Sequence, residues 1–174
     1  MTQDSDEYII KQCLGGDANA FRVIIERYQL PLYRTALGIT GLQQEAEDIT
    51  QNTFLKAWEK LDIYNPEYKF FSWIYRICVN ESLNSTRNLN KISSLEEEQT
   101  EDTTPHLELV KDEEHTLLKK AVDQLPEHYK TVIILRHFEE LNYQEIADIL
   151  QIKTDTVKSR LFTARNLLKD KLLD

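Results

Sequence analysis

The stretch from Tyr143 to Leu161, YQEIADILQIKTDTVKSRL, decides the fold of the second half of this chain. Apolar residues at helical spacing lie on both sides of a short break, a pattern typical of two helices joined by a tight turn. Ala147 is the small residue that lets two steeply crossed helices approach each other. The side chains expected to close the shared core are Ile146, Leu150, Ile152, Val157 and Leu161. The stretch therefore predicts a helix-turn-helix.

The turn between the two predicted helices contains two residues with consequences for the backbone. Thr154 is expected to be the N-cap of the second helix, with its hydroxyl accepting a hydrogen bond from a free backbone N–H. Gln151 stands where such turns usually carry glycine. It must therefore adopt a left-handed backbone or reshape the turn.

The second predicted helix combines an apolar stripe, from Val157 to Leu168, with a polar and basic opposite face. A basic amphipathic helix is by itself most often only a solvated face. Here the small residue, the apolar core set, the cap and six bases coincide at the spacing of a DNA-reading helix. Short polar groups and an aromatic ring suit base edges, and the cations suit phosphates. The predicted DNA contacts are Lys153, Thr154, Thr156, Lys158, Ser159, Arg160, Phe162, Thr163 and Arg165.

The chain around this basic helix is acidic. Its 174 residues carry a formal net charge of −9. Residues 89–116 hold two bases and nine acids, whereas residues 117–174 hold ten bases and nine acids. Most of the negative charge is thus concentrated in one middle segment, and such blocks indicate partners rather than folds.

Composition excludes several classes of protein. No run approaches the roughly 18 apolar residues of a membrane span, and the acidic start MTQDSDEYII lacks the features of a signal peptide. Four Gly and four Pro are too few for a turn-rich all-β protein. Cys13 and Cys78 are expected to be buried free thiols in a reducing cytoplasm. The four histidines have no metal-ligand spacing, and we expect no catalysis, no metal and no cofactor.

The first half of the chain predicts a small helical domain. A short helix is expected over 5–14, and Asp17 is an N-cap for a longer helix that Pro31 should bend. Two more helices are expected over 42–61 and 70–87. The deep face of the first of these is predicted to consist of Ala46, Thr50, Thr53, Phe54, Ala57 and Leu61.

The segment over 90–114 is poor in apolar residues and has no helical stripe. It cannot bury enough surface to offset the entropy cost of ordering, which predicts a flexible acidic linker. The sequence therefore predicts an all-α protein of two small helical domains, over 1–89 and 115–174, joined by this linker. The second domain is the helix-turn-helix domain.

One face of the helix over 42–61 is unusual for a solvated surface. Asp48, Gln51, Asn52, Leu55 and Glu59 lie along one stripe, with the leucine among polar groups. A single exposed leucine usually has no special role, but a leucine framed by amides also suits a protein-docking face. Periodicity alone leaves both interpretations open.

Aromatic residues cluster between this helix and the next. Phe70 and Tyr75 are expected in the domain core, and the other aromatics are candidates to stack on unpaired bases or to wedge a duplex open. Nearby cations would meet the DNA backbone, and two asparagines lie one and two turns beyond Arg76. The predicted contacts to melted DNA are Tyr64, Tyr68, Lys69, Trp73, Arg76, Asn80 and Asn84.

Four motifs in this order resemble those of bacterial RNA polymerase sigma factors of the extracytoplasmic-function (ECF) type. They are EAEDITQNTFLKAW at 45–58, FSWIYRICVN at 71–80, LPEHYK at 125–130, and YQEIA at 143–147 followed by TVKSRLFTAR at 156–165. The resemblance covers nearly the whole chain. Thr163 departs from the family, which often has arginine there, and the basic run after Asn84 is thin.

The resemblance implies a transcription initiation factor. It implies that the stripe from Asp48 to Leu55 binds the clamp helices of the largest subunit of core RNA polymerase, and it includes the polymerase flap among the partners. It assigns the aromatic loop and the helix after it to melting the −10 promoter element, and the helix-turn-helix to the duplex −35 element. It threads the acidic linker through the active-centre cleft and implies an anti-sigma factor as a further partner. No small-molecule substrate and no membrane insertion are expected.

The leading alternative is a stand-alone helix-turn-helix regulator that binds duplex DNA as a dimer. Such a regulator shares the second domain but has no use for the aromatic loop or for the polar stripe around Leu55. Co-purification with polymerase distinguishes the two.

Overall fold

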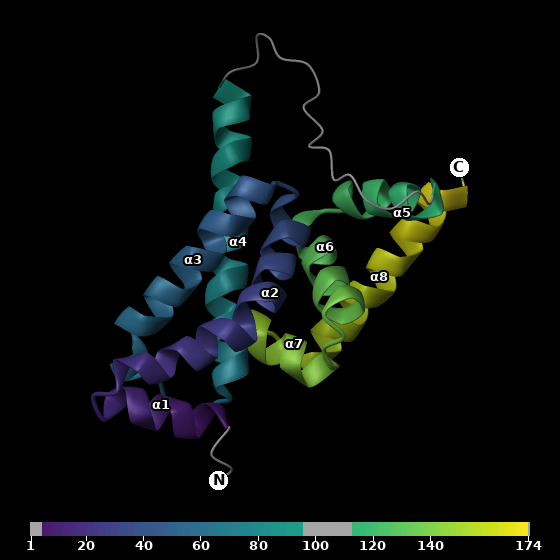
Figure 1. Ribbon diagram of the computed structural model, residues 1–174. Helices are drawn as coiled ribbons and strands as arrows, with labels where there is room; N and C mark the ends of the chain where they lie inside the picture. The colour runs from purple at the N-terminus through teal and green to yellow at the C-terminus, as the bar shows by residue number, and fades with distance from the viewer. Residues whose placement is uncertain (1–4, 96–112, 174) are drawn as a thin grey trace.

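The structure, a computed structural model, describes residues 5–95 and 113–173, and this part of the chain is built from helices without strands (Figure 1). The first half contains α1 (Asp6–Leu14), α2 (Phe21–Thr40), α3 (Gln43–Glu59) and α4 (Phe70–Leu95), with short 3₁₀ turns at Ala18–Ala20 and Leu61–Ile63. The second half contains α5 (Glu113–Asp123), α6 (Glu127–Ile133), a π-helical turn η3 (Ile134–Phe138), α7 (Tyr143–Leu150) and α8 (Thr154–Leu173).

Local signals in the sequence explain the ends and the bend of the first helices. The side chain of Asp17 accepts a hydrogen bond from the Asn19 backbone N–H at 3.1 Å, just before α2. Pro31 lies inside α2, where it removes one backbone donor, and the axis of α2 changes direction along its length (Figure 1). Gly41 ends α2 with a left-handed backbone (φ 74°) that glycine adopts without strain.

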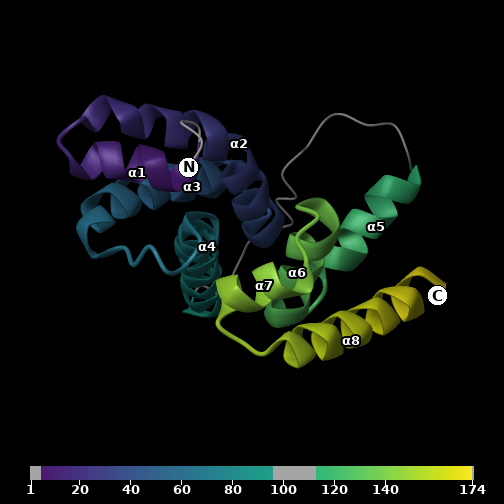
Figure 2. The same ribbon diagram turned by 90° about the horizontal axis from the view of Figure 1, so that it is seen from below.

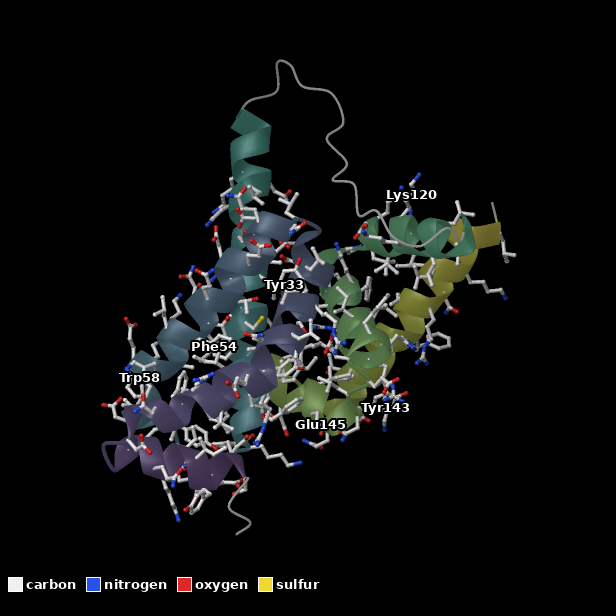
Figure 3. All side chains as sticks on the ribbon, viewed as in Figure 1. Tyr33, Phe54, Trp58, Lys120, Tyr143 and Glu145 are labelled. Atoms are coloured by element: carbon white, nitrogen blue, oxygen red, sulfur yellow. The ribbon has the colours of Figure 1, made fainter. Side chains whose placement is uncertain are left out.

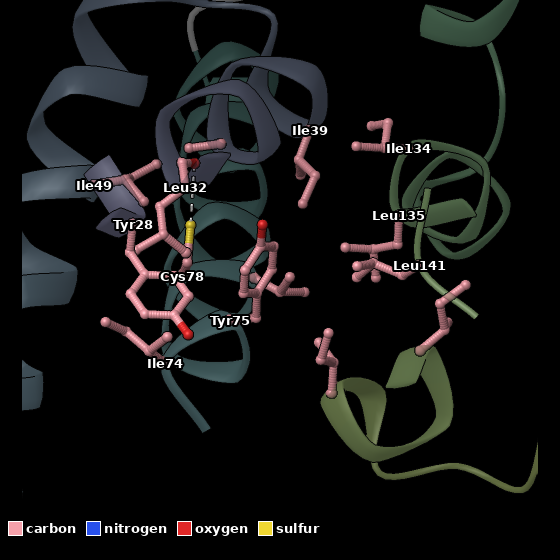
Figure 4. Packing of buried hydrophobic residues seen from close by; sticks show 14 of the residues in the cluster. Tyr28, Leu32, Ile39, Ile49, Ile74, Tyr75, Cys78, Ile134, Leu135 and Leu141 are labelled. Atoms are coloured by element: carbon pink, nitrogen blue, oxygen red, sulfur yellow. Dashed lines mark hydrogen bonds between the residues drawn. The ribbon is translucent and has the colours of Figure 1, made fainter. Parts of the chain in front are cut away.

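The core of the first half lies where α2, α3 and α4 pack together. The predicted deep face is confirmed, because all six residues are buried, five of them on α3 and Leu61 in the 3₁₀ turn that follows it. Cys78 is buried on α4, and its thiol donates to the Leu32 carbonyl at 3.5 Å (Figure 4). Cys13 is a buried free thiol as well, as predicted.

The helix-turn-helix is confirmed in α7 and α8. Ile146, Ala147, Val157 and Leu161 are buried at the crossing of the two helices. Gln151 adopts the left-handed backbone that its position demands, with φ 54° and ψ 43°. The Asn142 side chain accepts from the Glu145 N–H and the Glu145 carboxylate accepts from the Asn142 N–H, a capping box at the start of α7.

The prediction that Thr154 caps α8 is wrong by one residue. The carbonyl of Lys153 accepts the first hydrogen bond of the helix, from the Val157 N–H at 3.1 Å, so Lys153 holds the cap position and Thr154 begins the helix. The Thr154 hydroxyl donates instead to the Gln144 side chain at 3.3 Å. Thr154 thus connects the two helices of the motif.

The helices next to the predicted linker are longer than the sequence suggested. Helix α4 continues to Leu95 rather than ending near residue 87, and α5 begins at Glu113. No glycine or proline occurs between Phe70 and Pro105, so nothing local stops α4 at the predicted end. The central part of the predicted linker, 96–112, lies outside the described residues.

The two halves contact each other directly. Helix α4 lies against α7, and α2 lies against α6 and η3 (Figures 1 and 2). Figure 4 shows Ile39 and Tyr75 from the first half facing Ile134, Leu135 and Leu141 from the second.

Candidate nucleic-acid and protein interfaces

The polar stripe of α3 lies on the surface. Asp48, Gln51, Asn52 and Leu55 are all exposed, and 59% of the Leu55 surface is open to solvent. The hydrogen bonds and ion pairs of the described residues include none that involves these four side chains. The structure thus brings together the residues predicted to bind the polymerase.

Trp58, which the sequence pattern did not single out, extends this stripe by one turn. Its indole is 41% exposed and stands edge-on to the ring of Phe21, with centroids 5.1 Å apart (Figure 3). The spacing of three residues from Leu55 was the available signal, because residues at i and i+3 share a helix face. Leu55 and Trp58 together make an apolar edge beside the amides.

The rest of α3 is fixed to the domain. Lys56 pairs with Glu81 of α4 at 2.6 Å, and the Ser85 hydroxyl donates to Glu45 at 2.5 Å. Thr50 and Thr53 are buried and donate to backbone carbonyls one turn earlier. The exposed stripe is therefore carried by a helix whose other faces are tied to α4 and the core.

The predicted −10 contacts on α4 share one face. Trp73, Arg76, Asn80 and Asn84 follow one another at helical spacing, and Lys69 directly precedes the helix. Asn80 and Asn84 are exposed, as are Lys69 and Tyr68, whereas Trp73 and Arg76 are half-buried. The structure therefore places these predicted contacts together along α4 and the loop before it.

Tyr64 does not join this surface in the structure. Its ring is buried against Phe70 and Trp73, and its hydroxyl donates to the backbone carbonyl of Tyr68. Burial raises the pKa of Tyr64 to about 12, with smaller contributions from Glu7 and Asp6. The loop folds back so that Tyr64 completes the core, and Tyr68, 63% exposed, is the ring that it offers to solvent. Phe70 and Tyr75 are core residues, as predicted.

The outer face of α8 carries the predicted −35 contacts. Lys153, Lys158, Ser159 and Arg165 are exposed, and Phe162 presents 68% of its surface to solvent. The other predicted contacts are half-buried at the flanks of this face: Thr154, Thr156, Arg160 and Thr163. An exposed aromatic ring among cations and short polar groups is the composition that a major groove accepts.

A histidine that the sequence analysis did not assign lies beside this basic face. Arg165 approaches His137 Nε2 at 3.4 Å, and Arg136 lies over the ring of Tyr143 at 5.2 Å. Burial, Arg165 and Arg136 lower the pKa of His137, in that order of size. His137 and Arg165 are 28 positions apart in the chain, so no local sequence pattern indicated their contact.

Comparison with known proteins gives a family match for each half of the chain. The family model described as "Sigma-70 region 2" matches residues 24–92, and "Sigma-70, region 4" matches residues 115–168. The ECF RNA polymerase sigma factor SigW of Bacillus subtilis is 33% identical over 178 residues, covering 95% of each chain. The chain belongs to the ECF family of RNA polymerase sigma factors. RNA polymerase sigma-H factor of Pseudomonas aeruginosa is 29% identical over 186 residues, covering 99% of this sigma factor and 96% of the relative.

Solved structures resemble the sigma factor in fold. CnrH, solved in complex with the cytosolic domain of CnrY, aligns with a TM-score of 0.73 at 21% identity, covering 96% of each chain. The sigma factor RpoE of Bartonella quintana, solved in complex with the anti-sigma factor NepR, aligns with a TM-score of 0.71 at 25% identity. That alignment covers 87% of this chain and 96% of RpoE.

This ECF sigma factor acts in transcription initiation, and the alternative of a stand-alone regulator is not favoured. The region 2 match includes α3 and nearly all of α4, and the region 4 match includes α7 and most of α8. Within residues 5–95 and 113–173, no helix combines the length and the apolar character that crossing a bilayer requires. The same residues contain no cluster of three potential metal ligands.

Proposed function

We propose that this sigma factor binds core RNA polymerase through the exposed stripe of α3 and directs it to promoters with two separate DNA-binding surfaces. The face of α4 with the loop before it opens the −10 element, and α8 reads the −35 element as duplex. The observation that carries the proposal is the exposure of Leu55 among Asp48, Gln51 and Asn52 on a helix whose opposite face is buried in the domain core.

The α3 stripe suits a protein partner because it combines apolar area with unpaired amides. Leu55 and Trp58 offer a hydrophobic centre, and Gln51 and Asn52 offer hydrogen bonds at its rim. Stable interfaces have this arrangement of apolar core and polar edge. The clamp helices of the largest polymerase subunit are the proposed partner.

The α4 surface suits single-stranded DNA. Tyr68 is an exposed stacking platform, Lys69 and Arg76 supply positive charge, and Asn80 and Asn84 supply amide groups for base edges. We leave Tyr64 out of the DNA-contacting set because its ring fills the core. Trp73, half-buried against Tyr64 and Phe70, is a wall of this surface.

The proposed role has further consequences for partners. RpoE of Bartonella quintana was solved with an anti-sigma factor, and we propose that a partner of this kind restrains the present protein as well. The region 4 half is proposed to meet the polymerase flap, and the acidic segment around 96–112 is proposed to enter the active-centre cleft, where negative charge is favourable. In this role the protein performs no catalysis of its own. The proposed place of action is the cytoplasm, where RNA polymerase is.

The decisive test uses a variant that changes only the α3 stripe. Leu55→Asp introduces a charge at the centre of the proposed interface and should abolish assembly with core polymerase and run-off transcription from fragmented genomic DNA. Leu30→Asp is the matched control, because Leu30 is 58% exposed on α2, outside the stripe. Normal assembly by Leu55→Asp, or equal loss in both variants, would refute the proposed docking face.

A further inference from the structure

A cavity of about 250 Å³ lies between the start of α4 and the end of α7. One wall consists of residues just before α4 and in its first two turns: Tyr68, Lys69, Ser72 and Arg76. The facing wall includes Asp148 of α7 and Ile152 in the turn after it. Pockets for drug-sized ligands have volumes of roughly 300–1,000 Å³, so this cavity suits a smaller molecule.

The cavity lies at the amino-terminal end of α4. The Lys69 carbonyl accepts a hydrogen bond from the Trp73 N–H at 3.2 Å, so Lys69 is the cap residue and Ser72 is the third residue of the helix. The first N–H groups of an α-helix have no acceptor within the helix, and they form its positive end. Such ends bind phosphate and carboxylate groups. Every helix has such an end, so the side chains around it decide whether it holds a ligand.

The Ser72 hydroxyl is a buried polar group that is left without a partner at this end. Ser72 lines the cavity and is only 3% exposed, and within the described part of the chain its Oγ makes no hydrogen bond. The Tyr68 carbonyl, one turn earlier, accepts from the Tyr64 hydroxyl instead. Ser82, also buried on α4, donates to the Cys78 carbonyl at 2.9 Å. An unsatisfied buried hydroxyl costs free energy, and a hydrogen bond to a ligand would offset that cost.

Two cations lie beside this hydroxyl. Arg76 follows Ser72 by one turn on the same face of α4, and its Nε is buried without a partner. A terminal nitrogen of Arg76 donates to the Asp148 carbonyl at 2.7 Å, which fixes the guanidinium at the cavity wall. Lys69 is exposed and forms no ion pair with the described residues. The groups without partners are therefore mainly donors, so a ligand must bring acceptor oxygens.

One group in the cavity opposes an anion. The Asp148 carboxylate lies on the facing wall, where it accepts a hydrogen bond from the Gln144 side chain at 2.9 Å. The charged residues that line the cavity are Lys69, Arg76 and Asp148, two cations and one carboxylate. Their sum is one net positive charge, which favours an anionic ligand over a neutral or cationic one.

The Tyr68 ring adds a flat apolar wall to this polar end. The residue is 63% exposed, and its backbone is fixed on both sides. Its N–H donates to the Asn65 carbonyl at 3.1 Å, and its carbonyl accepts from Tyr64. Aromatic side chains of this kind stack on planar groups such as nucleobases. The ligand that fits therefore combines an anionic group with a planar ring.

We propose that this cavity binds a small phosphate monoester that carries a planar ring, such as a nucleoside monophosphate. The phosphate lies at the start of α4, where Lys69, Ser72 and Arg76 donate to it, and the ring stacks on Tyr68. The site itself does not depend on the proposed function. Its regulatory consequence does, because Tyr68, Lys69 and Arg76 also belong to the proposed −10 surface, so ligand and melted strand compete for them.

The test measures binding of adenosine 5′-monophosphate to the full-length chain by isothermal titration calorimetry, with adenosine and inorganic phosphate as partial probes. The monophosphate should bind more tightly than either fragment. Ser72→Ala removes the hydroxyl and should weaken monophosphate binding about tenfold, because a hydrogen bond to a charged group is among the strong ones. Ser82→Ala is the matched control, since it removes a buried hydroxyl of α4 outside the cavity and should bind as the wild type does.

Asp148→Asn tests the site in the opposite direction. The amide keeps an acceptor for Gln144 but removes the opposing charge, so this variant should bind the monophosphate several-fold more tightly. A damaged fold would weaken binding instead. Thermal denaturation without ligand checks Ser72→Ala separately, and this variant should be at least as stable as the wild type because it loses an unsatisfied hydroxyl.

Three results would overturn the proposal. They are monophosphate binding no tighter than that of adenosine, a Ser72→Ala variant that binds it like the wild type, and weaker binding by Asp148→Asn. Fluorescence anisotropy with a random-sequence single-stranded oligonucleotide of about 20 nucleotides forms a second arm. A Ser72→Ala variant that loses affinity for the oligonucleotide alone would assign the site to the DNA backbone and would also overturn the proposal.

The second arm also separates this site from the proposed function. We expect the monophosphate to displace the oligonucleotide from the wild type. Binding as described without displacement would refute the proposed path of the −10 strand along this part of α4 and leave the ligand site standing. Run-off transcription with core polymerase, measured on the wild type in parallel, reports the proposed function independently of the ligand.

Discussion

At the scale of single residues, Gln151 shows how a local strain is retained in the motif. Its backbone is left-handed, and a side chain with a Cβ costs about 1 kcal/mol in that conformation. Gln151→Gly should therefore raise the free energy of unfolding by about 1 kcal/mol, measured by urea denaturation. Gln151→Ala keeps the strain and removes the side chain, so a similar gain in that variant would contradict the explanation.

We propose that the residues on the outer face of α8 divide into those that read bases and those that meet phosphates. Arg160→Ala should weaken binding to all −35 duplexes by a similar factor and lower the salt dependence, because a phosphate contact carries no sequence information. Phe162→Ala, which removes the exposed aromatic ring of α8, should change which −35 sequences are bound. Binding selection from a random duplex pool distinguishes the two effects, and a changed preference in Arg160→Ala would contradict this division.

The limits of prediction at this scale follow from distance along the chain. Phe70 and Tyr75 could be assigned to the core because they lie on a helix with a readable period. Tyr64 lies in a loop without such a period, and its burial depends on how the loop folds back on Phe70 and Trp73. The pairing of Glu139 with Arg34 joins positions 105 residues apart, which no local pattern encodes.

At the scale of elements, the capping box of α7 decides where the helix-turn-helix begins. Asn142→Ala removes the acceptor for the Glu145 N–H and should lower the free energy of unfolding by about 1 kcal/mol. Asn142→Asp keeps an acceptor and should be close to the wild type. Thermal denaturation followed by circular dichroism measures both, and equal loss in the two variants would show that the cap is not the cause.

The helices themselves were predictable where an apolar stripe was long and regular. Helix α8 and the deep face of α3 show every predicted stripe residue buried. Their ends were less predictable, since the end of α4 at Leu95 has no glycine or proline to mark it. The one-residue error at Thr154 has the same origin, because Lys153 and Thr154 both precede the apolar stripe and either is able to hold the cap position.

At the scale of the whole molecule, the buried Glu139 links folding to pH. Burial raises the pKa of Glu139, and Arg34 and Tyr75 only partly oppose this. The folded chain thus binds a proton at this group more readily than the unfolded chain. Stability from this group is present below the usual carboxyl pKa and is lost as pH rises through the raised value of the folded state.

Glu139→Gln should remove this dependence. The difference in unfolding free energy between the variant and the wild type should grow in favour of the variant as pH rises above the usual carboxyl range, then level off. Urea denaturation from acidic to neutral pH measures the difference, and Glu140→Gln, at an exposed neighbour, is the control. A difference that does not vary with pH would contradict the assignment.

The arrangement of the two halves was beyond the reach of sequence reasoning. Each half is predictable from its own stripes, but the contact of α2 with η3 depends on complementary shapes such as those of Gly38 and Ile134. The sequence indicated an acidic segment between two helical units, and their direct packing is a finding of the structure.

The length of α4 has a consequence for the direction of the chain at its last residue. Its last turns rise beyond the other helices, ending at Leu95 (Figure 1). An α-helix rotates by about 100° with each residue, so the position of the last residue sets the direction, around the helix axis, in which the chain leaves the helix. Inserting one residue in these turns would rotate this exit direction by more than a right angle. Inserting about seven residues, close to two full turns, would leave the exit direction nearly unchanged. The number of residues in α4 therefore determines the angle, around the axis of α4, at which the chain leaves the helix.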